Sequence, residues 1–115
     1  MRLAIVAVSL GLVATPALAA DGAAVFNAQC RMCHQAATTP MAPTLAGVTG
    51  AKIASKPGFP YSPGLKAKSA QTWTDANLDA YLANPTGFAP GTRMLVKVPA
   101  AADRQALIKY LATLK

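Results

Sequence analysis

The sequence predicts a small all-α domain with long irregular loops. Apolar residues recur at helical spacing in three segments, near residues 21–34, 74–84 and 101–114. No segment shows the alternation of apolar and polar residues that marks a strand. The chain between these segments is rich in proline and glycine, which interrupt regular structure. A length of 115 residues leaves room for one domain at most.

Residues 1–19 are expected to lie outside that domain. Arg2 gives a positive start, a run of small apolar residues follows, and Ala17-Leu18-Ala19 supplies the small side chains that a signal peptidase requires. The apolar run is shorter than the roughly 18 residues of a membrane-spanning helix. We therefore predict a secretory signal peptide that is cleaved after Ala19 or Ala20, followed by one domain over residues 20–115. An uncleaved interfacial anchor is the alternative.

The first helix of the domain is predicted over residues 21–34, with Asp21 as its N-cap. Its end carries Cys30-Arg31-Met32-Cys33-His34. Two thiols at this spacing lie on one helical turn, so both can add to the vinyl groups of one haem while the adjacent imidazole reaches the iron. The chain has only these two cysteines and this one histidine.

The motif has two other interpretations. A disulfide or redox pair would not need His34, and a zinc site would need further sulfur or nitrogen ligands. Covalent attachment of a c-type haem is therefore the preferred interpretation, with His34 as an axial ligand.

Residues 35–71 are expected to form a long loop that wraps around a ligand. Five prolines and four glycines remove any periodicity, yet the apolar residues are too frequent for a disordered segment. Within this loop, the carbonyl group of Pro43 is the best candidate to accept a hydrogen bond from Nδ1–H of His34. That bond would leave Nε2 for the iron.

A second helix is predicted to start after Thr74, its N-cap, and to end near Asn84, because Pro85 follows. Another irregular loop is expected over residues 85–99. The last helix is predicted over residues 101–114, where apolar side chains form a stripe on one face. The stripe consists of Leu107, Leu111 and Leu114.

The sixth position on the iron decides the kind of haem protein. With one histidine in the chain, a bis-histidine haem is excluded. Met32 lies inside the attachment motif and Met41 follows His34 by only seven residues, whereas Met94 follows the turn Pro90-Gly91-Thr92-Arg93. We therefore predict Met94 as the second ligand. A thioether raises the reduction potential and occupies the position that a gas or peroxide would need, which favours electron transfer.

Three aromatic residues are candidates for contact with the haem. Tyr61 and Trp73 need hydrogen-bond partners if they are buried, and the haem propionates would be suitable acceptors. Tyr81 is expected to pack over the haem with its hydroxyl group near the sulfur of Met94. Each could instead be an ordinary core aromatic residue.

The charge balance restricts the partners. The chain has 11 Lys and Arg against 4 Asp and Glu. It lacks the runs of basic residues and the basic-aromatic pattern of nucleic-acid modules. An acidic protein surface is the favoured partner, and a generally solvated basic surface is the alternative.

These motifs together resemble those of class I cytochromes c of the mitochondrial and bacterial c2 type. The resemblance extends over nearly all of the chain after residue 20. It rests on Gly22, Phe26, Cys30–His34, Pro43-Thr44-Leu45-Ala46-Gly47, Gly58-Phe59-Pro60-Tyr61-Ser62, Trp73, Tyr81-Leu82-Ala83-Asn84-Pro85, Pro90-Gly91-Thr92-Arg93-Met94, Leu107 and Tyr110-Leu111.

The resemblance implies a small cytochrome c fold, in which three main helices and long loops wrap around one covalently attached haem. It implies one haem c held through Cys30 and Cys33, with His34 and Met94 as iron ligands. It also implies that the first helix crosses the last, with Gly22 as the point of close approach to Tyr110.

The chain also departs from the family pattern. Gly50-Ala51 stands where relatives often carry an arginine that faces a propionate, so Lys52 or Lys56 is expected to replace it. Val96 stands in place of an aromatic residue. Gln29 and Thr86 stand at two positions where relatives carry lysines around the haem edge. Three candidates for contact with a partner are left: Arg31, Arg93 and Lys97.

The sequence therefore predicts a periplasmic one-electron carrier that is not an enzyme, does not bind nucleic acid and is not stably inserted in a membrane after signal cleavage. Two alternatives stay open. One is a dedicated cytochrome subunit or partner of a periplasmic dehydrogenase. The other is a haem peroxidase or gas sensor with a labile sixth ligand.

Overall fold

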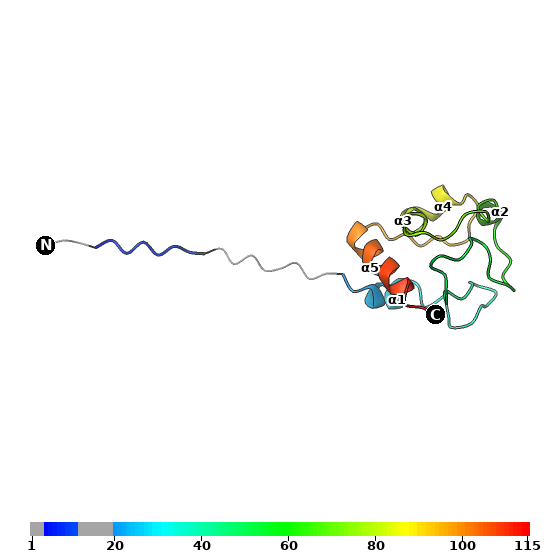
Figure 1. Cartoon of the computed structure of the whole chain (residues 1–115), viewed down its shortest axis with the longest axis horizontal. Coiled ribbons are helices and arrows are strands. Elements are labelled where there is room, and N and C mark those ends of the chain that lie inside the picture. Colours follow the sequence, from blue (N-terminus) through cyan, green and yellow to red (C-terminus); the bar gives the residue numbers. More distant parts are fainter. Residues whose placement is uncertain (1–3, 12–19) are drawn as a thin grey trace.

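The computed structural model describes residues 4–11 and 20–115 (Figure 1). Most of the predicted signal peptide falls outside these residues. The described part of the chain contains helices only, apart from one isolated bridge between Lys52 and Thr72. The helices are α1 (Gly22–Gln29), α2 (Pro63–Lys66), α3 (Asp75–Ala83), α4 (Pro85–Phe88) and α5 (Ala101–Leu111). None of the described helices is long and apolar enough to cross a membrane.

Helix α1 begins where the sequence predicts but ends earlier. The carboxylate of Asp21 accepts a hydrogen bond from the amide of Ala23 at 3.0 Å, which confirms its role as N-cap. The predicted extension to residue 34 is wrong. The amides of Cys30 and Arg31 both donate to the carbonyl oxygen of Phe26, which ends the regular ladder of the helix. The Cys30–His34 motif therefore lies on turns that follow α1.

Helices α3 and α5 confirm the other two predicted segments. Thr74 Oγ1 accepts from the amide of Asn77 at 3.1 Å, and α3 stops at Ala83, just before Pro85. Helix α5 starts at Ala101 as expected. It ends at Leu111, three residues before the predicted end, and the chain closes in turns.

Both loops predicted to be irregular contain a short helix. Pro63 and Pro85 each occupy the first turn of a four-residue helix, α2 and α4. The side chains of Ser62 and Asn84 cap these helices. Proline lacks an amide hydrogen and has a fixed φ angle, so it is accommodated in the first turn of a helix although it disrupts the interior. The prediction treated these prolines only as helix breakers, which is why it missed both helices.

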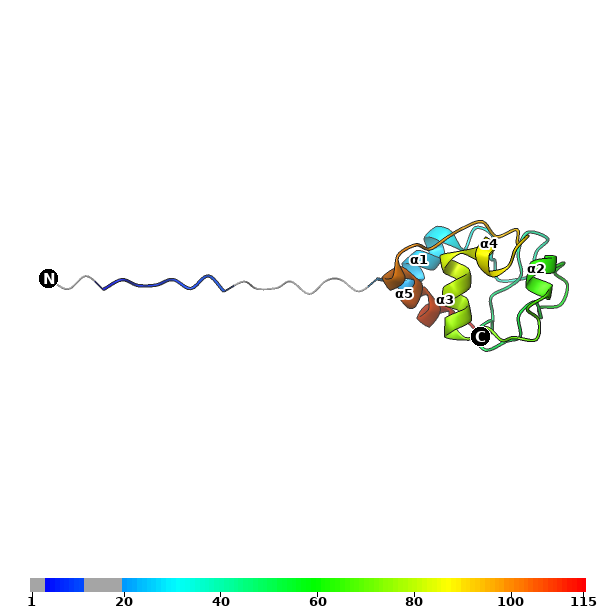
Figure 2. The same ribbon diagram turned by 90° about the horizontal axis from the view of Figure 1, so that it is seen from above.

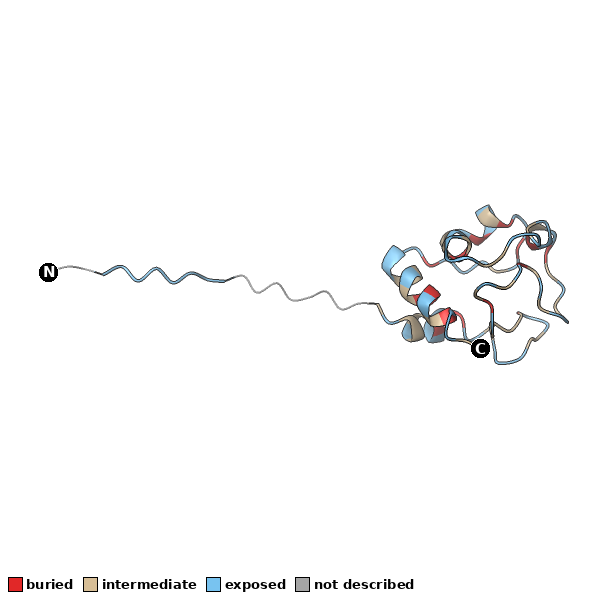
Figure 3. Ribbon diagram, in the orientation of Figure 1, coloured by how far each residue is buried: buried red, intermediate tan, exposed pale blue. Residues whose placement is uncertain are grey.

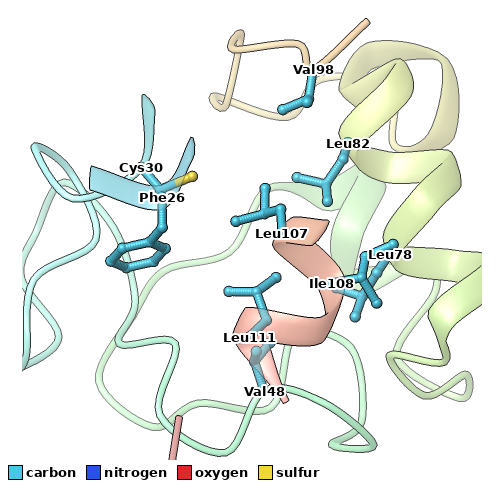
Figure 4. Close-up of a cluster of buried hydrophobic side chains, with 9 residues drawn as sticks. All are labelled: Phe26, Cys30, Val48, Leu78, Leu82, Val98, Leu107, Ile108 and Leu111. Atoms are coloured by element: carbon cyan, nitrogen blue, oxygen red, sulfur yellow. The ribbon is translucent and has the colours of Figure 1, made fainter. Parts of the chain in front are cut away.

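The buried hydrophobic residues form two clusters. Figure 3 marks the buried residues in red along the ribbon. The larger cluster joins α1, α3 and α5, and Figure 4 shows its members: Phe26, Cys30, Val48, Leu78, Leu82, Val98, Leu107, Ile108 and Leu111. The smaller one contains Ile53, Leu65, Tyr81 and Ala89. Trp73 and Met94 are half-buried and pack against both clusters.

Helix α1 packs against α5, and the two lie side by side in both ribbon views (Figures 1 and 2). The rings of Phe26 and Tyr110 meet with their centres 5.1 Å apart. A Cβ atom on Gly22 would overlap the carbonyl oxygen of Ala106 and approach Cβ of Tyr110 to 2.9 Å. This confirms the expected close approach and explains the glycine in the first turn of a helix.

The close approach at Gly22 leads to a stability prediction. A Gly→Ala change inside a helix usually stabilises it by roughly 0.5–1 kcal/mol. We expect Gly22→Ala to have the opposite effect and to lower the free energy of unfolding by about 1–3 kcal/mol, because the added methyl group overpacks the contact with α5. Chemical denaturation of the holoprotein measures the difference.

The exposed Ala24 of the same helix provides the matched control. Ala24→Ser is expected to change the free energy of unfolding by no more than roughly 0.5 kcal/mol. If Gly22→Ala were as stable as the wild type, the helices would not be in contact at this position.

Candidate functional site

A cavity of about 390 Å³ lies between the helices and the long loops. Side chains from both core clusters contribute to its walls, among them Leu78, Leu82, Leu107 and Leu65. The volume is within the range of small-molecule sites in proteins, which are usually apolar with a few polar groups in fixed positions. The composition of these walls fits a large, mostly apolar ligand.

The eight residues that the sequence singles out as haem contacts all line this one cavity. They come from the turns after α1, from the loop that follows, from α3 and from the segment before α5. They are Cys30, Cys33, His34, Pro43, Tyr61, Trp73, Tyr81 and Met94. The fold thus brings together residues that are up to 64 positions apart in the sequence.

The two cysteines are free thiols at the wall of the cavity, Cys30 buried and Cys33 half-buried. Burial, together with the charge of Cys33, raises the pKa of Cys30 to about 11. The Cys30 thiol is therefore protonated near neutral pH. Neither sulfur is engaged in a disulfide, so both are available for bonds to a ligand.

His34 is held by the hydrogen bond that the sequence predicts. Its Nδ1 lies 2.9 Å from the carbonyl oxygen of Pro43. Because a carbonyl group can only accept, Nδ1 carries the proton and Nε2 keeps its lone pair. Burial lowers the pKa of His34, and the bond to Pro43 partly opposes this effect. The imidazole is thus neutral and fixed in orientation, as a metal ligand requires.

Met94 is half-buried and follows a tight turn. The amide of Thr92 donates to the carbonyl oxygen of Ala89 at 3.0 Å, and Gly91 has a φ angle of +85° that favours glycine. This turn directs the chain back to the cavity, where Met94 forms part of the wall. His34 and Met94 thus reach one cavity from separate parts of the chain.

The hydroxyl group of Tyr81 has a partner that the sequence prediction missed. It forms a buried hydrogen bond of 2.8 Å with Thr92 Oγ1, two residues before Met94. Burial raises the pKa of Tyr81, and the bond to Thr92 opposes the shift. The pair links α3 directly to the turn that precedes Met94.

The hydroxyl group of Tyr61 also has a partner that the sequence prediction did not name. Its hydroxyl oxygen accepts a hydrogen bond from the amide of Lys56 at 3.1 Å. Burial raises the pKa of this tyrosine as well. Since the oxygen accepts from Lys56, the hydroxyl proton stays available for an acceptor in the cavity. The ammonium group of Lys56 donates to the carbonyl oxygen of Ala46.

Phe88 is a component of the site's surroundings that the sequence prediction missed. Its ring stacks on Trp73 with the ring centres 5.8 Å apart, and lies 5.6 Å from the ring of Tyr81. The ammonium group of Lys68 lies over the Phe88 ring, 4.5 Å from its centre. The stack holds the indole of Trp73 against the cavity. The only signal in the sequence was an aromatic residue directly after Pro85-Thr86-Gly87.

The donor set fits a covalently bound haem. Two free thiols, one neutral imidazole with a free Nε2 and one thioether line a cavity with mostly apolar walls. Nitrogen and thioether ligands are a common pair for haem iron.

Comparison with known proteins agrees with this donor set. The family model for cytochrome c matches residues 19–115. Cytochrome c2 of Rhodomicrobium vannielii is 43% identical over 96 residues, which make up 80% of this chain and 75% of that protein. Cytochrome c2 of Rhodopseudomonas palustris is 37% identical over 113 residues, covering 84% of this chain and 98% of that one.

Solved structures agree with these relatives. The ferricytochrome c2 of Rhodopseudomonas palustris superposes with a TM-score of 0.75 at 34% identity, covering 82% of this chain and 96% of that one. Cytochrome cH of Methylobacterium extorquens gives a TM-score of 0.72 at 36% identity, with 80% and 94% covered.

The buried Tyr81–Thr92 pair allows a double-mutant test. Thr92→Val leaves the hydroxyl of Tyr81 without a partner and removes the oxygen that accepts from the amide of Met94, whereas Tyr81→Phe leaves Thr92 with the Met94 amide as its remaining partner. Each change is expected to cost about 1–3 kcal/mol of stability, because an unpaired buried polar group loses its hydration without compensation. The double variant should cost less than the sum, with a coupling of about 1 kcal/mol. Denaturation of the four holoproteins gives these values.

The exposed Ser69 serves as a control, and Ser69→Ala should lie within roughly 0.5 kcal/mol of the wild type. Strict additivity of the two single changes would contradict the hydrogen bond.

Proposed function

The chain belongs to the cytochrome c family, and from that premise we propose that it carries single electrons in the periplasm through one haem c ligated by His34 and Met94. As a member of this family it is an electron carrier with an all-α cytochrome c fold, and not an enzyme. The observation that carries the proposal is the convergence of one fixed imidazole, one thioether and two free thiols on a single cavity.

The two cysteines are proposed to hold the haem through thioether bonds. The sulfur of each thiol bonds to one carbon of a vinyl group while its hydrogen goes to the other carbon, so no atom is lost. Two such bonds next to His34 would fix the haem relative to its first iron ligand. When bound, the haem supplies an iron centre that gains and loses one electron.

Met94 is proposed as the second iron ligand. A thioether stabilises the reduced iron and raises the reduction potential. It would also fill the coordination position that an oxygen-reactive haem keeps open. The apolar walls formed by Leu78, Leu82 and Leu107 would exclude water from the haem.

The polar end of the haem is proposed to lie near Tyr61, Trp73 and a lysine. The hydroxyl proton of Tyr61 and the indole N–H of Trp73 are suitable donors to propionates. Lys52 and Lys56 both line the cavity. Lys56 is the better candidate to replace the family's arginine, because its half-buried ammonium group lies beside the carbonyl oxygen of Ala46.

Electron transfer is proposed to occur with redox proteins that present an acidic surface. Arg31 and Lys97 are exposed and adjacent to residues of the site. Arg93 is exposed as well, although its guanidinium group donates to Pro60. Complementary charges accelerate association, and salt weakens this effect.

Replacement of Met94 tests whether it ligates the iron. We expect Met94→Ala to abolish the near-infrared charge-transfer band between methionine sulfur and ferric iron. The reduction potential should fall by roughly 0.1 V or more, since axial ligands set haem potentials over about 0.8 V. Absorption spectroscopy and redox titration of the purified protein measure both effects.

Met41 lines the same cavity and provides the control. Met41→Ala should keep the band. A high-spin ferric haem in the wild type would refute ligation by Met94 and favour the peroxidase or gas-binding alternative.

The export of the chain is a separate proposal with its own test. Expressed from Met1 in a bacterium that attaches c-type haem, the protein should appear in the periplasmic fraction with Ala20 or Asp21 as its first residue. N-terminal sequencing and intact mass identify the cleavage site. Leu10→Arg interrupts the apolar run and should block processing. Wild-type protein that retains residues 1–19 would contradict the proposed signal peptide.

A further inference from the structure

The segment that carries Met94 has no regular structure of its own. Residues 89–99, called the Met94 loop, lie between α4 and α5 and contain no helix or strand. The position of Met94 therefore depends on contacts that other elements make with this loop. These contacts fall into two groups, one before and one after Met94.

The part of the loop after Met94 is anchored to α3 and α5. The amide of Val98 donates to the carbonyl oxygen of Leu82 at 2.9 Å, and the Val98 side chain is buried. Arg104 donates to the carbonyl oxygens of Val98 and Pro99 at 2.9 and 2.8 Å, and pairs with Asp79 at 2.7 Å. This end of the loop is tied to the helical core.

The part before Met94 is anchored to a different region. Gly64 of α2 lies so close to the backbone of Ala89 and Pro90 that a Cβ atom would overlap them. Arg93 then reaches across to residues 33 positions earlier. Its Nη2 donates to the carbonyl oxygen of Pro60 at 2.5 Å, and its guanidinium carbon lies 5.4 Å from the centre of the Phe59 ring.

The anchor of Arg93 is itself fixed in place. The rings of Phe59 and Tyr61 meet edge to face with centres 5.0 Å apart, and Tyr61 accepts from the amide of Lys56. Arg93 and Phe59 both contribute to the cavity wall. The arginine thus connects the residue next to Met94 with a rigid aromatic pair on another wall of the same cavity.

We propose that Arg93 is a positioning residue, which keeps Met94 in the cavity by tying the Met94 loop to Phe59 and Pro60. The proposal rests on the ligation by Met94 proposed above. It assigns Arg93 a role different from contact with a partner, because its guanidinium group is already stacked and hydrogen-bonded within the domain. An arginine suits this role better than a lysine, since its planar group can stack and donate at the same time.

The physical consequence concerns the equilibrium between ligated and displaced Met94. An external ligand such as imidazole can bind ferric iron only when Met94 leaves. If departure of Met94 requires release of the Arg93 contacts, loss of these contacts makes the displaced state more accessible. Hydrogen bonds to charged groups are strong enough to shift such an equilibrium by about tenfold.

The test is a titration of the ferric holoprotein with imidazole. Binding is monitored through the loss of the near-infrared methionine band. We expect Arg93→Ala to bind imidazole about tenfold more tightly than the wild type, and Arg93→Lys to lie between them. Lys97→Ala is the matched control: it removes the same charge from an exposed position of the same loop and should bind as the wild type does.

A second readout separates positioning from a general structural role. In protein saturated with imidazole Met94 is already displaced, so Arg93→Ala and the wild type should unfold at the same temperature. A lower unfolding temperature of the saturated variant would overturn the proposal, and so would unchanged imidazole affinity. An equal gain in Lys97→Ala would attribute the effect to charge alone and overturn it too.

A different result would show that Met94 does not ligate the iron. A wild-type protein without the methionine band would refute ligation by Met94, and the positioning role with it. A wild type with the band and an insensitive Arg93→Ala would refute the positioning role alone.

Discussion

The cavity is the constraint on which the rest of this structure depends. Its walls take Leu78, Leu82 and Leu107 from one buried cluster and Leu65 and Tyr81 from the other. Burial of apolar surface is the main driving force of folding. In this domain much of that surface faces the cavity, so a bound haem would complete the contact between the two clusters. The direct packing that remains is concentrated where α1 crosses α5.

Because much of the apolar surface faces the cavity, the loops must be held by other contacts than side-chain packing. The loop after the Cys30–His34 motif is fixed by backbone hydrogen bonds to distant segments. Gly50 donates to the carbonyl oxygen of Trp73, Ile53 donates to that of Gln71, and Trp73 donates to that of Ala51. Ile53 is fully buried at the centre of this arrangement. These backbone bonds, together with the buried side chain of Ile53, hold this part of the loop in place.

The sequence predicted those features that depend on local chemistry. Asp21 and Thr74 act as caps through residues two or three positions away, and the Cys30–His34 motif, for which haem attachment is the preferred interpretation, contains every cysteine and histidine of the chain. Helices α2 and α4 were within reach of the same rules, since Ser62 and Asn84 each precede a proline. By contrast, the partner of Tyr81 depends on how the loop before Met94 lies against α3, and the partner of Tyr61 depends on how the loop of residues 35–71 folds back on itself. No spacing in the sequence specifies either arrangement.

The two proposed iron ligands differ in how far their supports extend along the chain. His34 is oriented by Pro43, nine residues away, within one continuous stretch that also contains both cysteines. Met94 is held by contacts from α3, α5 and the Phe59–Pro60 segment, so its support comes from distant parts of the chain. A local support persists as long as its own stretch is folded. A distributed support can be weakened one contact at a time without unfolding the domain. If Met94 ligates the iron as proposed, the Met94 loop is therefore where sequence changes would adjust ligand exchange and reduction potential while the attachment of the haem stayed intact.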